Sequence, residues 1–520
     1  MSTESKSSEL FGHPTGLFIL FFTEMWERFS YYGMRAILTL YMVAQTTDAN
    51  PGLGWDNTEA LALYGWYTML VYVASIPGGI IADKILGQKR SVLYGGWLLV
   101  AGHGVLSIEQ DWAFYSGLLL IILGVGLLKP NVSSMVGGLY APGDDRRDKG
   151  FSIFYIGINV GAALAALTVG FLAAKYGWHA GFGLAAIGMV LGQLVYVYGL
   201  KYLRDVGNKP VKSYDDPNSI SLGEIFKRML NTKKSVVTLI LLTIVSVFVP
   251  LTLMETEVIP YIIFFFFLSI VVSFMMTVFD DLNGRVEKDR FIVLLLSFLI
   301  VIVFWGAFEQ AGGLMNLYAE QKANRVVFGY NIPAAIMQFF NPFYIIALGL
   351  PVAAFWVWIK KRGKESSSIF KMGTGVIIMG LGFVFMIFAS LQYNEHGQSA
   401  LVWLVLAYLL HTIGELCASP VALSFITKLA PLRYGALMMG VYFAATGLGN
   451  KVAGIIGESA ENAGDLKVFT TITIFCVAFG ILVILLLKPL KRLTHGAEDK
   501  TIEGLEQEGF ELADSEIDKD

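Results

Sequence analysis

The hydrophobic pattern of the chain is a series of long apolar segments separated by short polar connections. About 20 apolar residues are enough for a helix to cross the hydrocarbon core of a bilayer. Fourteen segments reach this length, and we predict a membrane-spanning helix in each. Their approximate limits are 14–45, 58–83, 91–109, 112–135, 150–174, 180–202, 235–254, 257–279, 291–313, 334–359, 370–393, 399–426, 435–458 and 466–488. The pattern therefore predicts an all-α polytopic membrane protein.

The composition agrees with a membrane protein and excludes most soluble enzymes. Of the 520 residues, 55% are hydrophobic and 15% are charged, whereas soluble proteins carry about 25% charged residues. Glycine is frequent, which is typical of membrane helices that approach each other closely. The two cysteines, Cys417 and Cys476, both lie in apolar segments. We expect them to be packed in the interior rather than to form a disulfide or bind a metal.

Basic residues indicate how the chain is oriented in the membrane. Lys and Arg are concentrated on the cytoplasmic side of membrane proteins. Here they cluster in every second connection, so we predict that both termini are cytoplasmic and that the number of spans is even. The basic connections lie at 84–90, 146–149, 201–234, 285–290, 360–371, 428–433 and 488–492.

The seventh and eighth segments look like an insertion, because they follow a long polar linker and form a hairpin. Without them the chain has six spans, a linker and six spans, as in the two-halved major facilitator fold. Transporters of this kind bind substrate between their halves, near the middle of the membrane. The predicted parts are a cytoplasmic N-terminus (1–13), a first bundle (14–204), the linker with the hairpin (205–290), a second bundle (291–488) and an acidic tail (489–520).

We select seven of the charged residues that fall inside predicted spans, from both halves. A charge that faces lipid is costly, so such residues are expected to face a cavity or a partner. Together with Tyr31 and Tyr32, the four in the first segment follow spacings of three and four positions, which places them on one helical face. The seven are Glu24, Glu27, Arg28 and Arg35 in the first segment, Lys129 in the fourth, Glu309 in the ninth and Glu415 in the twelfth.

These charges suggest a means of moving protons. Burial favours the neutral form of a carboxyl group and a nearby cation favours its charged form, so making or breaking a pair binds or releases a proton. The alternative is that the pairs only hold helices together, but buried ion pairs often stabilise less than apolar packing. The candidates for proton coupling are Glu24, Glu27, Arg28, Lys129, Glu309 and Arg35.

The same charges predict the chemistry of a substrate. Cations in the first half would bind a carboxylate and Glu415 in the second half would bind an ammonium group, so a small zwitterion fits. Asparagine side chains could bond amide groups and aromatic rings could wall the cavity, although both residue types also serve helix packing. The candidate substrate-binding residues are Arg28, Tyr32, Arg35, Tyr67, Lys129, Asn159, Trp305, Asn331, Glu415 and Tyr442.

Local motifs give the chain a resemblance to a known family. They lie at 24–32 (Glu-x-x-Glu-Arg-Phe-x-Tyr-Tyr), 128–131 (Leu-Lys-Pro-Asn), 154–161, 304–310 and 411–420. Together they resemble the proton-dependent oligopeptide transporter family of the major facilitator superfamily. The resemblance covers nearly the whole membrane portion, and the extra hairpin is similar to that of bacterial members.

The resemblance implies import of di- and tripeptides across a bacterial inner membrane, driven by the proton gradient. It implies that Glu24, Glu27 and Glu309 serve coupling, with Arg35 as the partner of Glu309. Peptide contacts would come from Arg28, Tyr32, Tyr67, Lys129, Asn159, Asn331 and Glu415. The expected partners are peptides, protons and the lipid bilayer. We expect no cofactor, metal, ATP or nucleic acid.

A further motif, at residues 78–90, resembles the signature that the wider superfamily carries between spans two and three. Gly78 and Gly79 would permit close helix approach. Asp83 could pair with basic residues such as Arg90 to hold a cytoplasmic gate. The expected role of this motif is conformational.

Two other functions are compatible with the same fold. One is transport of another small anion such as nitrate, against which Glu415 argues because a carboxylate offers an anion nothing to bind. The other is a peptide receptor that does not transport, in which the paired titratable groups would have no purpose. An enzyme is not expected, because the sequence shows no recognisable nucleophilic arrangement and no phosphate-binding loop.

Overall fold

The computed structural model describes residues 9–141, 144, 146–208, 222–253, 258–282, 284–431 and 434–499. Most of these residues are helical. Some of the segments discussed above lie outside these ranges. These segments are the first eight residues, most of the polar linker, the turn of the inserted hairpin, the last residues of the basic connection at 428–433 and the acidic tail from residue 500 onward.

Packing divides the chain into two compact units. One unit consists of Met1–Val211, Phe298–Leu423 and Gly440–Leu486. The other consists of Lys212–Ser297, Ser424–Met439 and Leu487–Asp520. All of the predicted site residues belong to the first unit. The predicted boundaries of the two six-helix bundles follow the order of the spans along the chain and not this packing, so they stay a prediction.

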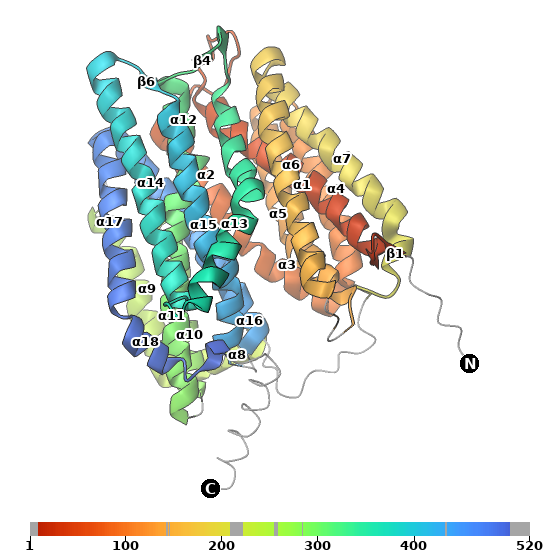
Figure 1. Ribbon diagram of the computed structural model, residues 1–520, viewed down its shortest axis with the longest axis vertical. Helices are drawn as coiled ribbons and strands as arrows, with labels where there is room; N and C mark the ends of the chain where they lie inside the picture. The colour runs from red at the N-terminus through yellow and green to blue at the C-terminus, as the bar shows by residue number, and fades with distance from the viewer. Residues whose placement is uncertain are drawn as a thin grey trace. The chain divides into compact units, whose positions relative to one another are not determined.

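The first half of the chain contributes seven α-helices to the first unit. They are α1 (Thr15–Val43), α2 (Asn57–Val73), α3 (Ser75–Ile81), α4 (Gln88–Leu106), α5 (Asp111–Gly138), α6 (Arg146–Tyr176) and α7 (Trp178–Leu203). A π-helical turn, Ala82–Leu86, follows α3. Helix α1 packs against α6 and α7, and α4 packs against α5, so these helices form the group at the right of Figure 1.

The second half supplies the facing helices of this unit. They are α11 (Gly284–Phe308), which enters the unit at Phe298, α12 (Leu314–Gln321), α13 (Phe340–Lys361), α14 (Ser368–His396), α15 (Val402–Leu429), α16 (Gly435–Ala463) and α17 (Asp465–Leu485). Two 3₁₀ turns, Glu309–Ala311 and Ala334–Phe339, join α11 to α12 and lead into α13. Helices α14 and α17 pack along each other.

The second unit contains the inserted segment. Its helices are α8 (Leu222–Asn231), α9 (Lys233–Leu253), α10 (Val258–Asp281), the first part of α11, and α18 (Leu487–Leu493), followed by a 3₁₀ turn at Ala497–Asp499. Helices α9 and α10 pack against each other. Ion pairs from Arg228 to Asp281 and from Lys234 to Asp280 join the start of this segment to the end of α10.

Short strands occur only in connections of the described chain. Strand β1 (Glu9–Leu10) pairs antiparallel with β2 (His13–Pro14), and Arg146 at the start of α6 donates hydrogen bonds to Glu9 and to the carbonyl of Gly12. The remaining pairs are β3 (Ala323–Asn324) with β6 (Ser399–Ala400), parallel, and β4 (Val326–Val327) with β5 (Tyr330–Asn331), antiparallel. The predicted all-α class is therefore confirmed.

Each of the fourteen predicted apolar segments overlaps one or more of the described helices. Within the described ranges, ten helical stretches are long and apolar enough to cross a membrane. Helix α1 is not among them, because it carries four charged residues near its middle. The polytopic character follows from these stretches, whereas the count of fourteen and the side on which the termini lie stay predictions.

Glycines allow helices of the first half to touch through their backbones. A Cβ added at Gly78 of α3 would lie 1.9 Å from the carbonyl oxygen of Gly126 in α5. The approach that the sequence predicts for Gly78 is therefore present. The same expectation for Gly79 is wrong in this structure, because a Cβ there would meet no atom within 4 Å. The physical reason is that Gly79 lies one position further around the helix, away from α5.

These two neighbouring glycines make a matched test of the packing. Gly78→Ala should lower the thermal unfolding midpoint in detergent, because the added methyl group must displace the backbone of α5 at a cost of about 1–3 kcal/mol. Gly79→Ala should leave the midpoint unchanged or raise it slightly, since alanine favours helix. Equal midpoints for the two variants would contradict the close packing of α3 on α5.

Candidate functional site

A cavity of about 240 Å³ lies inside the first unit and is lined by both halves of the chain. Its wall contains charged side chains of both signs and several polar ones. The charged lining residues are Glu24, Arg28, Arg35 and Lys129 from the first half, and Glu309 and Glu415 from the second. Six of the seven charged residues found in the predicted spans thus share one chamber. The seventh, Glu27, lies beside it as a partner of Arg28.

The charges on α1 form a compact cluster. Arg28 Nε lies 2.8 Å from Glu24 Oε1 and 2.6 Å from Glu27 Oε2. The pair with Glu24 is possible because side chains four residues apart stack on one helical face. Glu27 is fully buried, and Arg28 Nη2 has no hydrogen-bond partner among the described residues. The cluster therefore holds a guanidinium at the cavity with a donor left to bind a ligand.

A second cation of the first half comes from α5. Lys129 lines the cavity, and its Nζ lies 3.6 Å from the centroid of the Tyr72 ring of α2. A ring face attracts a cation through its quadrupole, so Tyr72 holds the ammonium at the wall. The predicted cavity residue Tyr32 also lines the chamber, and its ring lies 4.7 Å from the guanidinium carbon of Arg35.

The predicted pair between Arg35 and Glu309 is present. Arg35 Nη1 lies 2.9 Å from Glu309 Oε1 and joins α1 to the turn after α11. Tyr64 of α2 donates a hydrogen bond of 2.6 Å to the same carboxylate oxygen. Arg35 Nη2 also donates to Gln338 Oε1 at 3.3 Å. One carboxylate of the second half is therefore held by two helices of the first.

Further contacts between the halves lie beyond this pair. Thr39 donates to the carbonyl of Gly312, and the amide of Asn316 donates to the carbonyl of Ala36 at 2.9 Å. These residues lie toward the end of the unit where residues 44–56 connect α1 to α2, which we call the α1–α2 end. Both sets of contacts join α1 to the segment after α11. The halves are therefore bound together between the cavity and the α1–α2 end.

In the second half, Glu415 of α15 is oriented by a residue that the sequence prediction missed. Asn341 of α13 donates to Glu415 Oε2 at 2.8 Å and to Thr412 Oγ1 at 3.1 Å. Asn341 and Glu415 both line the cavity. An asparagine inside the apolar segment 334–359 was a signal that could have identified it.

The structure does not bring the predicted residue Asn331 to the cavity. Asn331 lies in β5, is exposed and is absent from the cavity lining. The chain reverses at Phe328 and Gly329, which have φ of 50° and 84°. Helix α13 consequently begins only at Phe340. In this conformation Asn341, and not Asn331, lines the cavity, so the expected peptide contact of Asn331 stays a prediction.

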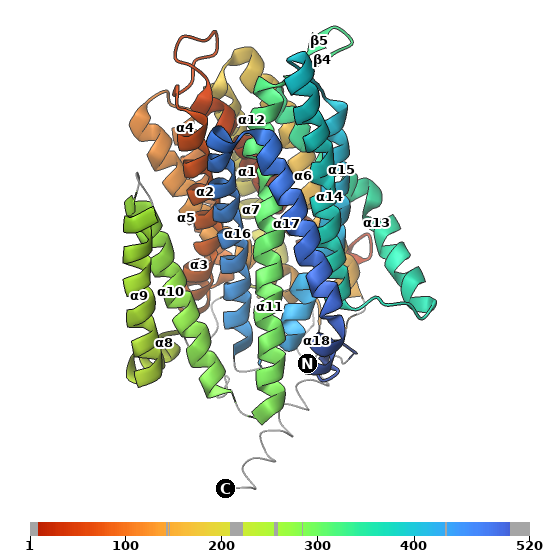
Figure 2. The same cartoon turned by 90° about the vertical axis from the view of Figure 1, so that its left-hand side faces the viewer.

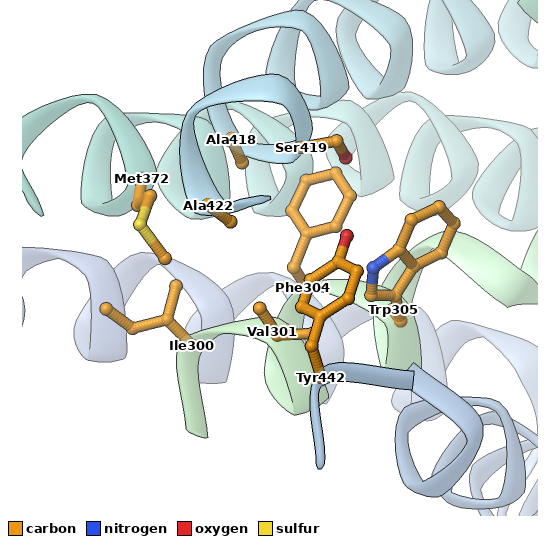
Figure 3. A pocket seen from close by; sticks show the side chains of 9 residues that line it. All are labelled: Ile300, Val301, Phe304, Trp305, Met372, Ala418, Ser419, Ala422 and Tyr442. Carbon is orange, nitrogen blue, oxygen red and sulfur yellow. The ribbon is translucent and has the colours of Figure 1, made fainter. Parts of the chain in front are cut away.

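The other predicted contacts differ in their positions. Asn159 and Trp305 line the cavity, and the amide of Asn159 donates to the carbonyl of Tyr155 at 2.9 Å. Tyr67 is buried in α2 but is not a lining residue of the cavity. Tyr442 of α16 lines a separate small apolar pocket that it shares with Trp305. Figure 3 shows these two rings side by side.

The small pocket in Figure 3 has a volume of about 10 Å³, which is room for a single water molecule at most. Its other lining residues are Ile300, Val301, Phe304, Met372, Ala418, Ser419 and Ala422. Trp305 and Ser419 also line the main cavity. An apolar recess therefore adjoins the cavity on the side of the second half.

The motif at residues 78–90 shows the expected close helix approach at Gly78 but not the expected pairing of Asp83. Asp83 and Arg90 are both exposed, and no ion pair joins Asp83 to a basic residue within the part of the chain that the structure describes. The expected pairing is therefore absent in this conformation, because Asp83 points to the surface from the π-helical turn. Lys89 instead donates hydrogen bonds to the carbonyl of Arg204 and to the side-chain oxygen of Asn208. These bonds hold the end of α7 against the start of α4.

The described residues contain no group of three or more His, Cys, Asp and Glu side chains that could hold a metal ion. His103 and His411, the two fully buried histidines, lie on different helices and pack in the interior. The cavity therefore offers carboxylates, cations and amides as its reactive groups.

Comparison with known sequences decides the family. The sequence model of the POT family matches residues 89–472. This chain belongs to the POT family. The resemblance that the local motifs predicted is thereby confirmed.

Curated relatives of this POT family member are bacterial transporters. The chain is 36% identical over 507 residues to the peptide transporter YePEPT of Yersinia enterocolitica, covering 94% of this chain and 96% of the relative. It is 35% identical over 496 residues to the di-/tripeptide transporter of Lactococcus lactis, covering 93% and 97%. It is also 39% identical over 497 residues to the uncharacterized transporter YclF of Bacillus subtilis, covering 94% and 96%.

Solved structures of POT transporters share the fold. A crystal structure of a peptide transporter POT in complex with sulfate aligns with a TM-score of 0.80 and 37% identity, covering 94% of this chain and 97% of that one. A POT family transporter in complex with 5-aminolevulinic acid aligns with a TM-score of 0.78 and 31% identity, covering 93% and 98%. The predicted transporter fold is therefore confirmed.

The contacts around Glu309 predict how the α1–α2 end depends on charge. Glu309→Gln should lengthen or broaden the distance between spin labels placed at the exposed residues 59 and 462, because Arg35 would lose the carboxylate that binds it across the halves. Loss of a buried ion pair partner costs about 3–5 kcal/mol. The measurement is pulsed electron resonance on the doubly labelled protein in a membrane.

The matched control is Glu320→Gln, which removes a carboxylate from the partly exposed pair with Arg325. This variant should leave the distance unchanged, because surface pairs contribute little. Indistinguishable distances in Glu309→Gln and the unmutated chain would show that the pair with Arg35 does not hold the halves together.

Proposed function

We propose that this protein is a proton-coupled symporter that imports di- and tripeptides across a bacterial inner membrane by alternating access. The single observation that carries this proposal is one cavity with three cations, Arg28, Arg35 and Lys129, on the wall of the first half and a hydrogen-bonded carboxylate, Glu415, on the wall of the second. The names of its relatives, which include di-/tripeptide transporters, agree with it.

A short peptide would span this cavity from one half to the other. Its carboxylate would bind Arg28 and Lys129, because guanidinium and ammonium groups form charge-assisted hydrogen bonds with carboxylates. Its amino terminus would bind Glu415. Asn341 donates a hydrogen bond to this carboxylate and fixes it in place. Asn159 would bond the peptide amide from α6. Variable side chains would meet the aromatic and apolar wall around Trp305.

The arrangement favours a zwitterion over an inorganic anion. An ion such as nitrate would find the two cations but would also face Glu415 in the same cavity, and a carboxylate repels it. A substrate that carries an ammonium group at its other end uses all three charges. Competition of nitrate with dialanine would therefore be weak.

Alternating access requires the closed end of the molecule to open. The contacts of Arg35, Thr39 and Asn316 hold the halves together on the α1–α2 end, which we assign to the outside on the basis of the basic loops. In major facilitator transporters the halves rock about a central site. These contacts must break once in each cycle so that the next peptide can enter.

Protons would act through the buried carboxylates. When Glu309 binds a proton, its charge attraction to Arg35 is lost and the outer contacts weaken. When Glu24 or Glu27 binds a proton, Arg28 loses one of its two carboxylate partners and becomes available to a peptide. Proton binding would thus favour an outward-open, peptide-binding state. No cofactor enters this scheme, and the coupling ion is the proton.

The direct test is uptake of radiolabelled dialanine into proteoliposomes that contain the purified protein. With an acidic exterior, we expect accumulation above the external concentration, and none when a protonophore removes the gradient. Uptake that reaches only equilibrium, with or without a gradient, would overturn the proposal of symport. No uptake of any peptide would overturn transport itself.

Replacement of one buried carboxyl group should separate transport from coupling. Glu27→Gln should abolish uphill uptake, because the amide cannot take up a proton beside Arg28, while exchange of internal for external peptide continues at a similar rate. The measurement is paired uptake and counterflow in the same vesicles. Glu395→Gln, which changes an exposed carboxylate, should reduce neither. Retention of uphill uptake by Glu27→Gln would assign coupling elsewhere.

A further inference from the structure

Helix α8, which precedes the inserted hairpin, is amphipathic. Its sequence is Leu-Gly-Glu-Ile-Phe-Lys-Arg-Met-Leu-Asn, and the apolar residues recur at intervals of three and four positions, so they form one stripe along the helix. Met229 of this stripe is fully buried, whereas Phe226 and Leu230, one turn apart, are each 49% exposed. One edge of the apolar stripe is therefore left open.

The position of α8 is set by ion pairs with the end of the hairpin. Helix α10 contains one of the stretches that are long and apolar enough to cross a membrane, and it ends with Asp280 and Asp281. Arg228 Nη1 of α8 lies 2.7 Å from Asp281 Oδ1, and Lys234 Nζ at the start of α9 lies 2.8 Å from Asp280 Oδ1. Figure 2 shows α8 beside the lower ends of α9 and α10. Because charged residues avoid the hydrocarbon and collect at its boundary, these pairs place α8 at the membrane surface.

The exposed side of α9 indicates that this part of the chain meets lipid. Val237, Ile240, Leu241 and Ile244 are each about half exposed, and their spacing of three and four positions places them on one helical face. A continuous exposed apolar face of this kind is typical of a helix that contacts hydrocarbon. It begins only a few residues beyond Asn231, the last residue of α8. Phe226 and Leu230 consequently lie close to the bilayer.

Cations border the open apolar edge of α8. Arg228 and Lys234 are paired with the aspartates of α10. Lys227 and Lys233 are exposed, and neither forms an ion pair with any residue that the structure describes. Lys227 lies three positions before Leu230, so the two side chains are neighbours on the helix surface. A lysine in such a place can lay its aliphatic stem on the apolar boundary while its ammonium group reaches the lipid headgroups.

We propose that α8 lies in the membrane interface and binds anionic phospholipids. Phe226 and Leu230 would enter the boundary of the acyl chains, and the ammonium groups of Lys227 and Lys233 would bind the negatively charged headgroups. Neutral lipid would leave these two charges without a counter-charge. The partner is thus an anionic lipid surface, which fixes the start of the inserted hairpin to one leaflet. The proposal does not depend on what the protein transports.

The experiment places a fluorophore on α8 of the full chain, through Asn231→Cys, in nanodiscs that hold one copy of the protein. The native cysteines Cys417 and Cys476 are buried, so the label is selective. The nanodiscs consist of phosphatidylcholine with a small fraction of lipid that carries a nitroxide near the top of one acyl chain. This labelled lipid is either phosphatidylglycerol or phosphatidylcholine. We expect both to quench the fluorophore, and the anionic lipid to quench at least about twofold more, because basic residues concentrate anionic headgroups around them.

Substitutions separate charge from mere proximity to the membrane. Lys227→Gln combined with Lys233→Gln should remove the preference for phosphatidylglycerol and leave the quenching by phosphatidylcholine in place. Lys227→Arg combined with Lys233→Arg should keep the preference. The matched control is Lys361→Gln combined with Lys364→Gln, which removes two exposed cations at the end of α13. This control should also keep the preference, because these lysines are not part of the α8 surface.

Several results would overturn the proposal. Equal quenching by the two lipids in the unmutated chain, or a preference that survives loss of both Lys227 and Lys233, would refute the anionic contact. Absence of quenching by either lipid would place α8 away from the membrane. Quenching that appears only after deletion of residues 500–520 would assign the open edge to the acidic tail. Loss of quenching in nanodiscs that hold two copies would assign it to a second copy of the chain.

Discussion

Buried charge is the constraint on which the rest of this structure depends. A helix with Glu24, Glu27, Arg28 and Arg35 near its middle cannot face hydrocarbon, because unpaired ions lose several kcal/mol of hydration there. In the structure, Arg28 pairs with Glu24 and Glu27, and Arg35 pairs with Glu309 of the other half. Tyr64 donates a hydrogen bond to the same carboxylate of Glu309. Glu24, Arg28 and Arg35 also line a cavity. Binding of a charged ligand and contact between the halves therefore draw on the same small set of groups.

This shared set links the cargo to the movement of the halves. In the proposed mechanism the carboxylates that hold Arg28 would compete with the carboxylate of a peptide, and the carboxylate that holds Arg35 would also keep the α1–α2 end together. Apolar glycine contacts between α2 and α16 add attraction that no charge controls. Closure therefore depends on this packing as well as on the charged contacts.

The sequence was sufficient for features that follow from spacing along the chain. Apolar length predicted the helices, and helical spacing predicted the charged face of α1. The pair of Arg35 with Glu309 was predicted from a family resemblance and is present at 2.9 Å. Features that depend on how distant segments meet were harder. Asn331 was selected, but it lies in β5 away from the cavity, whereas Asn341 of α13 lines it.

Other residues of the site could not be recognised from the sequence. Tyr64 and Gln338 bind the Arg35–Glu309 pair, but nothing along the chain distinguishes them from packing residues. Their roles arise only when α2 and the turn before α13 are placed beside α1. The pairing expected for Asp83 failed because the π-helical turn directs this side chain to the surface.

The most direct test of the account is calorimetric binding of dialanine and of its N-acetylated and amidated forms to the unmutated chain, Glu415→Gln and Lys129→Gln. If opposite halves bind opposite ends of the peptide, Glu415→Gln should weaken dialanine at least about tenfold, since a charged hydrogen bond is lost. It should leave the N-acetylated form unaffected. Lys129→Gln should weaken the binding of dialanine, which has a free carboxylate, and leave the binding of the amidated form unaffected. Equal weakening of free and blocked peptides by either variant would contradict the central claim.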